Sequence, residues 1–584
     1  MECMWGLMNK MPADGAPEPE GRAARPWARF TLFWLSLCLA AFALAALVPT
    51  FGNLSTFFLF RQDRWLLVAA TLLLLVSGER LKRRAVPLAL PRHAVWIAAA
   101  ATMLVCYLGH YWILCDYDMS RDEQMAVFDS QIFSSGRLVQ PLPPLWQPHA
   151  DALNTLFMLP VRNPTAWVSA YLPVNAALRS LIALIGDPAL TGPLMTALGA
   201  IALWNCARLL WPEDREAAVI ALLLYLASGQ VLLAGMSAYA MPAHLALDLF
   251  WLWLFLLNQR SADFAALIVG FLATGLHQPL FHPLFVAPFL LCLLRDKAWP
   301  RLIIFVAGYA AISLFWLAWP VGMHALITGP NSTTARIGTD YWSRLRLMLM
   351  TGRDPRFIDM PANLLRYVAW QPILLLPLMF AGLASARRGG TAGALAIGIL
   401  LPIVIMFVIM PRQGHGFGYR YLHGVIGNAV LLAVFGWRHM AASHDWLRPL
   451  LQRTILAGLV VILPLQLWMM NNFYAPFATA DKRIATSAVD YFIMGEDDAP
   501  FAGDLVLNRP DLTNRPVRVL AADLDDPLIA AICRPGISVA VATDSFYQPI
   551  NGYFGSLPAG VADRRLTRLS VRLAEAGCSV GRFD

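Results

Sequence analysis

Charged residues are scarce in this sequence. They make up 14% of its 584 residues, whereas 58% are hydrophobic, and the mean hydropathy is +0.56. A soluble domain carries about 25% charged residues, so this composition excludes an ordinary soluble protein. Apolar runs of about 17 to 25 residues recur along most of the chain, and they are too long and too poorly alternating for barrel strands. We therefore predict an all-α polytopic membrane protein.

Nucleotide and metal motifs are also missing. The chain has no glycine-rich phosphate loop of the Walker or Rossmann type, no HExxH motif and no Cys/His spacing typical of zinc. A net charge of +8 could indicate a nucleic-acid partner, but Arg and Lys mostly lie in short loops between apolar runs. The sequence thus argues against a nucleotide-dependent enzyme, a zinc enzyme and a nucleic-acid partner.

The eight cysteines are few for a chain of this length. Most of them lie in or beside apolar runs, where a thiol acts as a small hydrophobic group. Cys533 and Cys578 instead fall in the C-terminal tail. If this tail lies in an oxidising compartment, the two can form a disulfide, and two separate thiols are the alternative.

Hydropathy windows of about 19 residues locate thirteen candidate spans. The spans cover residues 30–49, 65–78, 94–114, 189–208, 216–235, 242–258, 262–276, 279–294, 301–320, 369–385, 391–410, 421–437 and 453–470. If the N-terminus is cytoplasmic, six inner loops each carry Arg or Lys, whereas the outer connections 236–244 and 275–279 carry neither. The positive-inside rule therefore predicts a multi-pass protein of the inner (plasma) membrane, with a cytoplasmic N-terminus and an extracytoplasmic C-terminus.

The same pattern divides the chain into four parts. We expect a disordered cytoplasmic tail (1–29), an N-terminal transmembrane hairpin (30–93), a transmembrane core (94–470) with outer loops at 115–188 and 321–368, and a periplasmic α/β domain (471–584). In the last part, residues 515–524 and 536–543 are typical of strands, and residues 567–577 are typical of a helix.

An acidic segment, DYDMSRDEQMAVFDSQIFSSG (116–136), follows the third span on the outer side. Met125, Phe128 and Ile132 recur at helical spacing, which predicts an amphipathic helix lying on the membrane. Asp122 and Glu123 then occupy the first turn of this helix. Acids at that position complement the helix dipole, so a structural role is one interpretation of the pair and a catalytic role is the other.

Asp116 and Asp118 precede this helix. Because hard cations favour oxygen ligands, the two carboxylates could help to bind a divalent cation. Solvated loop acids, or contacts to substrate hydroxyls, are the alternatives. The sequence indicates no other cofactor.

The order of motifs between about 94 and 437 resembles the GT-C superfamily of integral-membrane glycosyltransferases. The resemblance is greatest to the family 39-like enzymes that use polyprenyl-phosphate sugars, which are related to protein O-mannosyltransferases and aminoarabinose transferases. The segments that carry it are RDEQMAVFDSQIFSSGRL, WVSAYLPVNAALRSLIALIGDP (167–188), LWNCARLLWPEDR (203–215) and GYRYLHGVIGNAVLL (418–432), whose RY matches the family's RY motif.

Two features depart from that family. Two helices precede the span that leads into the acidic segment, where many relatives have one helix in total, so the first hairpin is an addition. The outer turn at 274–279 reads TGLHQP, whereas relatives often have TKGP. A lysine that could contact the lipid phosphate is therefore missing.

The resemblance implies that a monosaccharide moves from a polyprenyl phosphate to an acceptor hydroxyl outside the membrane. The acceptor would be an envelope glycan, a glycolipid or a protein, and the membrane lipid would surround the donor's tail. Such a reaction needs a carboxylate that takes the acceptor proton and cations or donors that stabilise the leaving phosphate. Asp122 is the expected general base and Glu123 the alternative, and a one-step displacement would invert the anomeric carbon.

Arginines on the outer side are candidate phosphate ligands, because Arg can grip a phosphate bidentately. Arg420, next to Tyr421 in the RY motif, and Arg412 lie at a short outer mouth. The second outer loop carries six more: Arg336, Arg344, Arg346, Arg353, Arg356 and Arg366. For these six, a surface helix over lipid headgroups is the alternative interpretation.

Histidines also favour the outer side, with eight there and three inside. His277, His282 and His415 are the candidates for substrate contacts, although each could be a hydrogen-bonding wall residue. Asp248 lies inside a span, where facing lipid would cost about 2.5 to 3.5 kcal/mol. We therefore expect Asp248 to face the bundle, lining a cavity or locking two helices together.

Two other functions compete with glycosyl transfer. A transporter or flippase for lipid-linked sugars would distribute ionisable residues through its spans, or would show paired broken helices in two related halves. An O-antigen polymerase or ligase would also have many spans and large outer loops rich in Arg and His. The polar groups here gather at one face, unlike those of a transporter, and a polymerase or ligase does not explain an acidic pair on an amphipathic helix at this place. A structural or scaffold role is the residual class.

Overall fold

The computed structural model describes residues 27–48, 53–79, 88, 91, 93–330, 332–334, 346, 350, 356–556 and 560–584. The expected tail lies outside the described residues, except for its last three residues, which begin the first helix. Arg336, Arg344 and Arg353 of the second outer loop also lie outside them.

The chain is mostly helical, and each predicted span contains helical residues. The apolar helices are α2 (Trp27–Leu47), α4 (Arg64–Gly78), α5 (Ala94–Trp112), α8 (Thr191–Leu210), α9 (Arg215–Leu226), α10 (Gly229–Gly235), α11 (Met241–Leu257), α12 (Arg260–Thr274), α13 (Phe281–Arg295), α14 (Trp299–Ile327), α17 (Leu375–Ala386), α18 (Gly390–Ile409), α19 (Ile426–Ala441), α20 (Leu447–Ala457) and α21 (Leu463–Ala485). The predicted all-α membrane fold is confirmed.

Not every predicted span is long enough to cross a membrane alone. By length and composition, six helical stretches of the described residues can do so, or seven if α9 and α10 form one span bent by 62°. The remaining apolar helices, such as α11, α13 and α17, are shorter. Hydropathy windows include the apolar turns at helix ends, so they overestimate the length of such helices.

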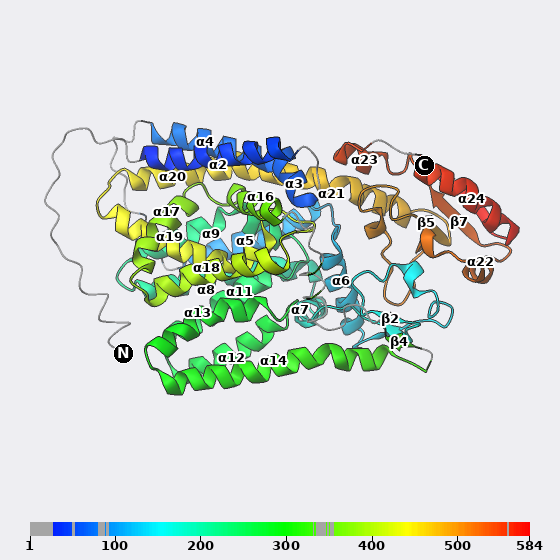
Figure 1. Ribbon diagram of the computed structural model, residues 1–584, viewed down its shortest axis with the longest axis horizontal. Helices are drawn as coiled ribbons and strands as arrows, with labels where there is room; N and C mark the ends of the chain where they lie inside the picture. The colour runs from blue at the N-terminus through cyan, green and yellow to red at the C-terminus, as the bar shows by residue number, and fades with distance from the viewer. Residues whose placement is uncertain are drawn as a thin grey trace.

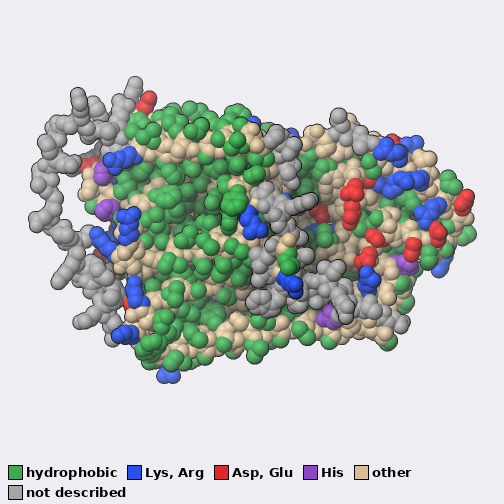
Figure 2. All heavy atoms as spheres, in the orientation of Figure 1, with side chains coloured by type: hydrophobic (Ala, Val, Ile, Leu, Met, Phe, Trp, Pro, Cys, Tyr) green, Lys and Arg blue, Asp and Glu red, His purple; other side chains and the backbone are tan. Residues whose placement is uncertain are grey.

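The helices run side by side along the long axis of the molecule, with the C-terminal domain at one end (Figure 1). The visible flank of the bundle is covered by hydrophobic side chains (Figure 2). On that face, Lys and Arg gather at the end of the bundle opposite to the C-terminal domain (Figure 2). An apolar flank between two polar ends is typical of a protein that spans a bilayer.

The C-terminal domain contains a parallel sheet in the order β6–β5–β7–β8. Its elements are β5 (Tyr491–Met494), β6 (Val517–Leu520), α22 (Asp526–Ile532), β7 (Ser538–Ala542), α23 (Gln548–Phe554), α24 (Val561–Glu575) and β8 (Ser579–Phe583). The two predicted strands correspond to β6 and β7 and the predicted helix to α24, whereas β5 and β8 were missed. A disulfide joins Cys533, after α22, to Cys578, before β8.

The acidic segment forms α6 (Arg121–Ser134), as its spacing predicted, but the expected position on the membrane surface is wrong. Met125, Phe128 and Ile132 share a buried hydrophobic cluster with sheet residues such as Val519. Helix α6 lies between the bundle and the C-terminal domain (Figure 1). An apolar stripe shows only that something apolar covers it, and here the cover is protein.

Candidate active site

A capping box sets the start of α6. The Ser120 hydroxyl accepts a hydrogen bond from the Glu123 backbone N–H (3.2 Å), and the Glu123 carboxylate accepts one from the Ser120 N–H (3.1 Å). This reciprocal pair satisfies two amides that a helix start leaves unbonded. Asp122 lies between these two residues, in the first turn of α6.

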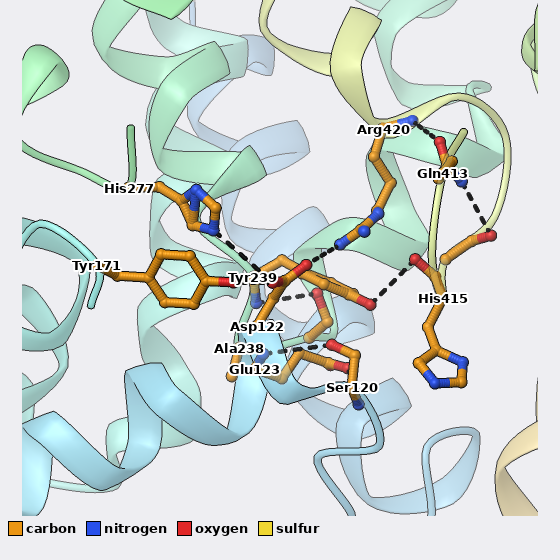
Figure 3. A network of polar contacts seen from close by, with 12 residues as sticks. Ser120, Asp122, Glu123, Tyr171, Ala238, Tyr239, His277, Gln413, His415 and Arg420 are labelled. Atoms are coloured by element: carbon orange, nitrogen blue, oxygen red, sulfur yellow. Dashed lines mark hydrogen bonds and ion pairs between the residues drawn. The ribbon is translucent and has the colours of Figure 1, made fainter. Parts of the chain in front are cut away.

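Asp122 is the centre of a polar cluster (Figure 3). Arg420 Nη1 donates a hydrogen bond to Asp122 Oδ2 at 2.6 Å, and the Tyr171 hydroxyl donates one to Oδ1. His277 Nε2 lies 3.9 Å from the same Oδ1. The Asp122 side chain keeps 18% of its surface exposed, so it remains accessible to a ligand.

Two loops between helices bring Tyr171 and His277 together. The Leu172 N–H donates to the His277 carbonyl (3.3 Å), and the Val174 N–H donates to the Gly275 carbonyl (2.9 Å). This pairing joins the start of α7 (Val174–Ala183) to the turn between α12 and α13. The Tyr171 and His277 rings then stack with their centroids 4.1 Å apart.

Arg420 begins the 3-10 helix η4 (Arg420–Val425) and is held on several sides. Its backbone N–H donates to Gln413 Oε1 (2.7 Å), and its guanidinium lies 4.6 Å from the centre of the Tyr239 ring. Gly416 adopts φ +122°, and a Cβ there would lie 2.5 Å from Arg420 Cδ. A residue without a side chain is therefore required at position 416.

The neighbouring charges and burial determine the protonation states of Asp122 and His277. Burial opposes ionisation of Asp122, but the Arg420 guanidinium, His277 and the Tyr171 hydroxyl together hold its pKa below the usual value. Burial, with a smaller contribution from Arg420, lowers the pKa of His277 to about 4 against the attraction of Asp122. At neutral pH the cluster therefore holds a carboxylate, a guanidinium and a neutral imidazole.

A cavity of about 450 Å³ lies against this cluster. Its volume falls within the range of about 300 to 1,000 Å³ that small-molecule sites occupy. The polar side chains in its wall come from the bundle, the loops between its helices and the C-terminal domain: Ser120, Arg121, Asp122, Tyr171, His244, Asp248, His277, Gln278, Arg412, His415, Arg420, Tyr421 and Asp504. Apolar side chains such as Phe281 and Met410 complete the wall.

Several residues that the sequence singled out meet at this cavity. Besides Asp122, Arg420 and His277, they are Arg412, His415 and Tyr421. Arg412 Nε donates to Asp359 Oδ2 (3.1 Å) and its side chain is 47% exposed, whereas His415 Nε2 lies 3.1 Å from Asp504 Oδ2. Tyr421 stacks on Phe281.

Glu123 and His282 were predicted at the site but do not line the cavity. Glu123 is fully buried, completes the capping box and accepts a hydrogen bond from the Tyr474 hydroxyl (3.2 Å). Its carboxylate therefore supports α6, which corrects the expectation of an alternative base. His282 is also fully buried and bonds to Asp248 within the bundle (2.6 Å). Asp248 does line the cavity, so it both faces the site and links two helices.

Asp116 and Asp118 do not line the cavity either. Asp116 adopts φ +57°, is 61% exposed and contacts His110 (3.3 Å). The backbone carbonyl of Asp118 accepts a hydrogen bond from Gln124 (3.0 Å). Within the part of the chain that the structure describes, no group of three or more His, Cys, Asp or Glu side chains could hold a metal ion.

Sequence reasoning missed Tyr171, Tyr239 and the C-terminal domain's share of the site. Arg121 of α6 lies 3.4 Å from Asp504 and donates to the carbonyls of Gly503 and Val506. These bonds place the loop around Asp504 at the cavity. The sequence offered one indication of this contact, Arg121 beside the acidic pair. An arginine at the start of a helix is unfavourable to the helix dipole, so its side chain needs a partner elsewhere.

Together these features define an integral membrane protein of the GT-C fold, as the sequence predicted. Among solved structures, the chain is similar to ArnT from Cupriavidus metallidurans bound to undecaprenyl phosphate, with 13% identity and a TM-score of 0.50 over 84% of this chain and 90% of ArnT. The apo form of ArnT gives 14% identity and a TM-score of 0.45 over 71% and 84%. No family model and no curated protein matches the sequence.

Proposed function

We propose that this protein transfers a monosaccharide from a polyprenyl phosphate to an extracytoplasmic acceptor, which is an envelope glycan, a glycolipid or a protein. One observation carries the proposal: a carboxylate and a guanidinium, Asp122 and Arg420, lie 2.6 Å apart on a cavity of a GT-C fold. A structure of similar fold binds undecaprenyl phosphate, which supports a polyprenyl phosphate as the lipid partner.

Asp122 acts as the general base. As the acceptor oxygen bonds to the anomeric carbon, its proton moves to the carboxylate. The bond from that carbon to the phosphate oxygen breaks, and its electron pair leaves with the polyprenyl phosphate. Attack from the face opposite to the phosphate inverts the anomeric carbon.

Arg420 stabilises the leaving phosphate. Its Nε is buried without a hydrogen-bond partner among the described residues, so the guanidinium has a donor to offer. Arg412 lines the same cavity and supplies a second positive charge. An anionic donor that binds Arg420 weakens the attraction between Arg420 and Asp122. The carboxylate then gains proton affinity when the donor is present.

The domain end of the bundle faces the periplasm or the cell exterior. In a polyprenyl-phosphate sugar, the bond that breaks during transfer joins the sugar to the phosphate of the lipid. An enzyme on that side therefore needs no nucleotide-linked donor. The loops at the opposite end carry Arg and Lys, which supports a cytoplasmic position for them.

The test is turnover by purified protein in lipid nanodiscs supplied with polyprenyl-phosphate monosaccharides and envelope acceptors. Asp122→Asn keeps the size and one acceptor oxygen of the side chain but removes the base. We expect its turnover to fall by about 100- to 10,000-fold, the range of general-base contributions, while folding and donor binding persist.

Asp116→Asn is the matched control. It makes the same chemical change six residues earlier, at an exposed carboxylate that does not line the cavity. This variant should retain the turnover of the unmodified protein. Undiminished turnover in Asp122→Asn would assign the base to another residue.

A further inference from the structure

Two polar residues of the cavity wall lie on a helix of the bundle. His244 and Asp248 are four residues apart on α11, so both face the cavity from one side of the helix. Asp248 lies about 10 Å along the helix from its first residue, Met241. Titratable groups at such depth in a membrane protein are costly unless a partner or a ligand satisfies them.

Asp248 already has a hydrogen-bond partner within the bundle. The Tyr309 hydroxyl lies 2.7 Å from His282 Nε2, and His282 Nδ1 lies 2.6 Å from Asp248 Oδ1. With Tyr309 donating to Nε2, the Nδ1–H of His282 donates to the carboxylate. Three helices, α11, α13 and α14, therefore fix the orientation of Asp248.

The remaining polar atoms are unsatisfied. Neither ring nitrogen of His244 has a hydrogen-bond partner among the described residues, although only 6% of the residue is exposed. Asp248 Oδ2 likewise accepts no hydrogen bond from the described residues. A Cβ at Gly424 would lie 3.0 Å from that oxygen, so the glycine leaves its approach open. Buried polar groups left in this state point to a ligand that supplies the missing bonds.

The chemistry of the pair restricts that ligand. A carboxylate repels a phosphate, which finds cations at Arg420 and Arg412 instead. An isoprenoid tail offers no hydrogen bonds, so covering Asp248 and His244 with it would leave both groups desolvated and unpaired. A sugar hydroxyl fits, since it donates to a carboxylate and exchanges a hydrogen bond with an imidazole.

We infer that His244 and Asp248 form a subsite that binds hydroxyl groups of the transferred sugar and thereby selects which sugar is accepted. The inference rests on the proposed function, because it requires a sugar-linked donor in this cavity. His282 and Tyr309 are positioning residues that hold Asp248 toward the sugar.

The test measures binding of lipid probes to the full-length protein in nanodiscs. The probes are undecaprenyl phosphate, a panel of undecaprenyl-phosphate monosaccharides, and monodeoxy analogues of the tightest binder. The protein should bind one sugar-linked lipid more tightly than undecaprenyl phosphate. Asp248→Asn and His244→Phe should each weaken binding of that lipid by about 10- to 100-fold and leave undecaprenyl phosphate binding unchanged.

The monodeoxy analogues separate recognition from a structural effect. An analogue that lacks the hydroxyl bound by Asp248 should bind weakly to the unmodified protein and equally weakly to Asp248→Asn, because the bond is already absent. Asp263→Asn is the matched control. Asp263 is a buried carboxylate that bonds to Arg301 (2.7 Å) and does not line the cavity, so its loss should leave sugar selectivity intact.

Two results would overturn the inference alone: unchanged sugar selectivity in both variants, or equal weakening of undecaprenyl phosphate and its sugar-linked forms. If the unmodified protein binds neither undecaprenyl phosphate nor any panel member, the proposed function fails and the subsite fails with it.

Discussion

At the scale of the residue, Asp122 shows how neighbours decide what a carboxylate can do. A guanidinium, a phenol and an imidazole contact it from different segments, and they keep it charged in spite of burial. Glu123, one position along, points into the protein and caps the helix. Two adjacent acids therefore have different roles, which only their side-chain directions reveal.

The pH dependence of kcat/KM follows from this cluster. In the proposed role Asp122 acts when ionised, and its lowered pKa keeps it ionised to a lower pH than an ordinary aspartate. His277, with a pKa of about 4, stays neutral until the same region. In the Asp248→Asn variant, which lacks the other carboxylate assigned to donor binding, we therefore expect kcat/KM to be flat from about pH 5.5 to 8 and to fall below about pH 4. A fall centred near pH 6.5, the value of an ordinary histidine, would contradict this account.

At the scale of the element, the N-terminal hairpin supports the loop that carries Arg420. Asp63, at the end of the π-helix η1 (Leu59–Asp63), accepts from Arg366 Nε (2.9 Å) and from Trp370 Nε1 (3.0 Å). Arg366, on α16 (Arg356–Ala369), then donates to the Gly416 carbonyl (2.6 Å). Arg366 thus links the N-terminal hairpin to the loop that carries Arg420.

Asp63→Asn should destabilise the protein strongly. The Asp63 and Arg366 side chains are both 0% exposed, and removing one partner of a buried ion pair costs about 3 to 5 kcal/mol because the other charge remains. Thermal unfolding in detergent measures the loss. Asp214→Asn, which breaks a partly exposed pair with Arg438, should cost less than about 1 kcal/mol. Equal melting temperatures for the two variants would show that the buried pair does not hold the hairpin.

The elements were predictable from the sequence to the extent that they depend on local pattern. Helical spacing located α6, and alternating apolar residues located β6 and β7. The site depends on pairs that are distant in sequence, such as Asp122 with Tyr171 (49 residues apart) and with Arg420 (298 residues apart). No local rule relates such residues. The RY motif identified Arg420 only through resemblance to a family.

At the scale of the whole molecule, composition predicted a membrane protein, and the GT-C fold was expected because the order of motifs resembles that superfamily. The association of α6 with the C-terminal domain could not be predicted, because an apolar helix face packs equally well on lipid or protein. The contribution of Asp504 to the cavity depends on this association. The domain therefore forms part of the site, with Arg121 linking it to α6.

The orientation of the molecule gives a further prediction. Alkaline phosphatase, which is active only outside the cytoplasm, should be active when fused after Asp584 and inactive when fused at Arg387, in a basic loop. Fluorescent-protein fusions should give the reverse pattern. Phosphatase activity at Arg387 and none at Asp584 would place the cavity on the cytoplasmic side.

The most direct test of the central claim is mass spectrometry of envelope glycans and glycolipids from cells that lack this protein. We predict that one species loses the mass of a single monosaccharide, that the unmodified gene restores it, and that the Asp122→Asn gene does not. Full restoration by the Asp122→Asn gene, or spectra that do not change on deletion, would contradict the account.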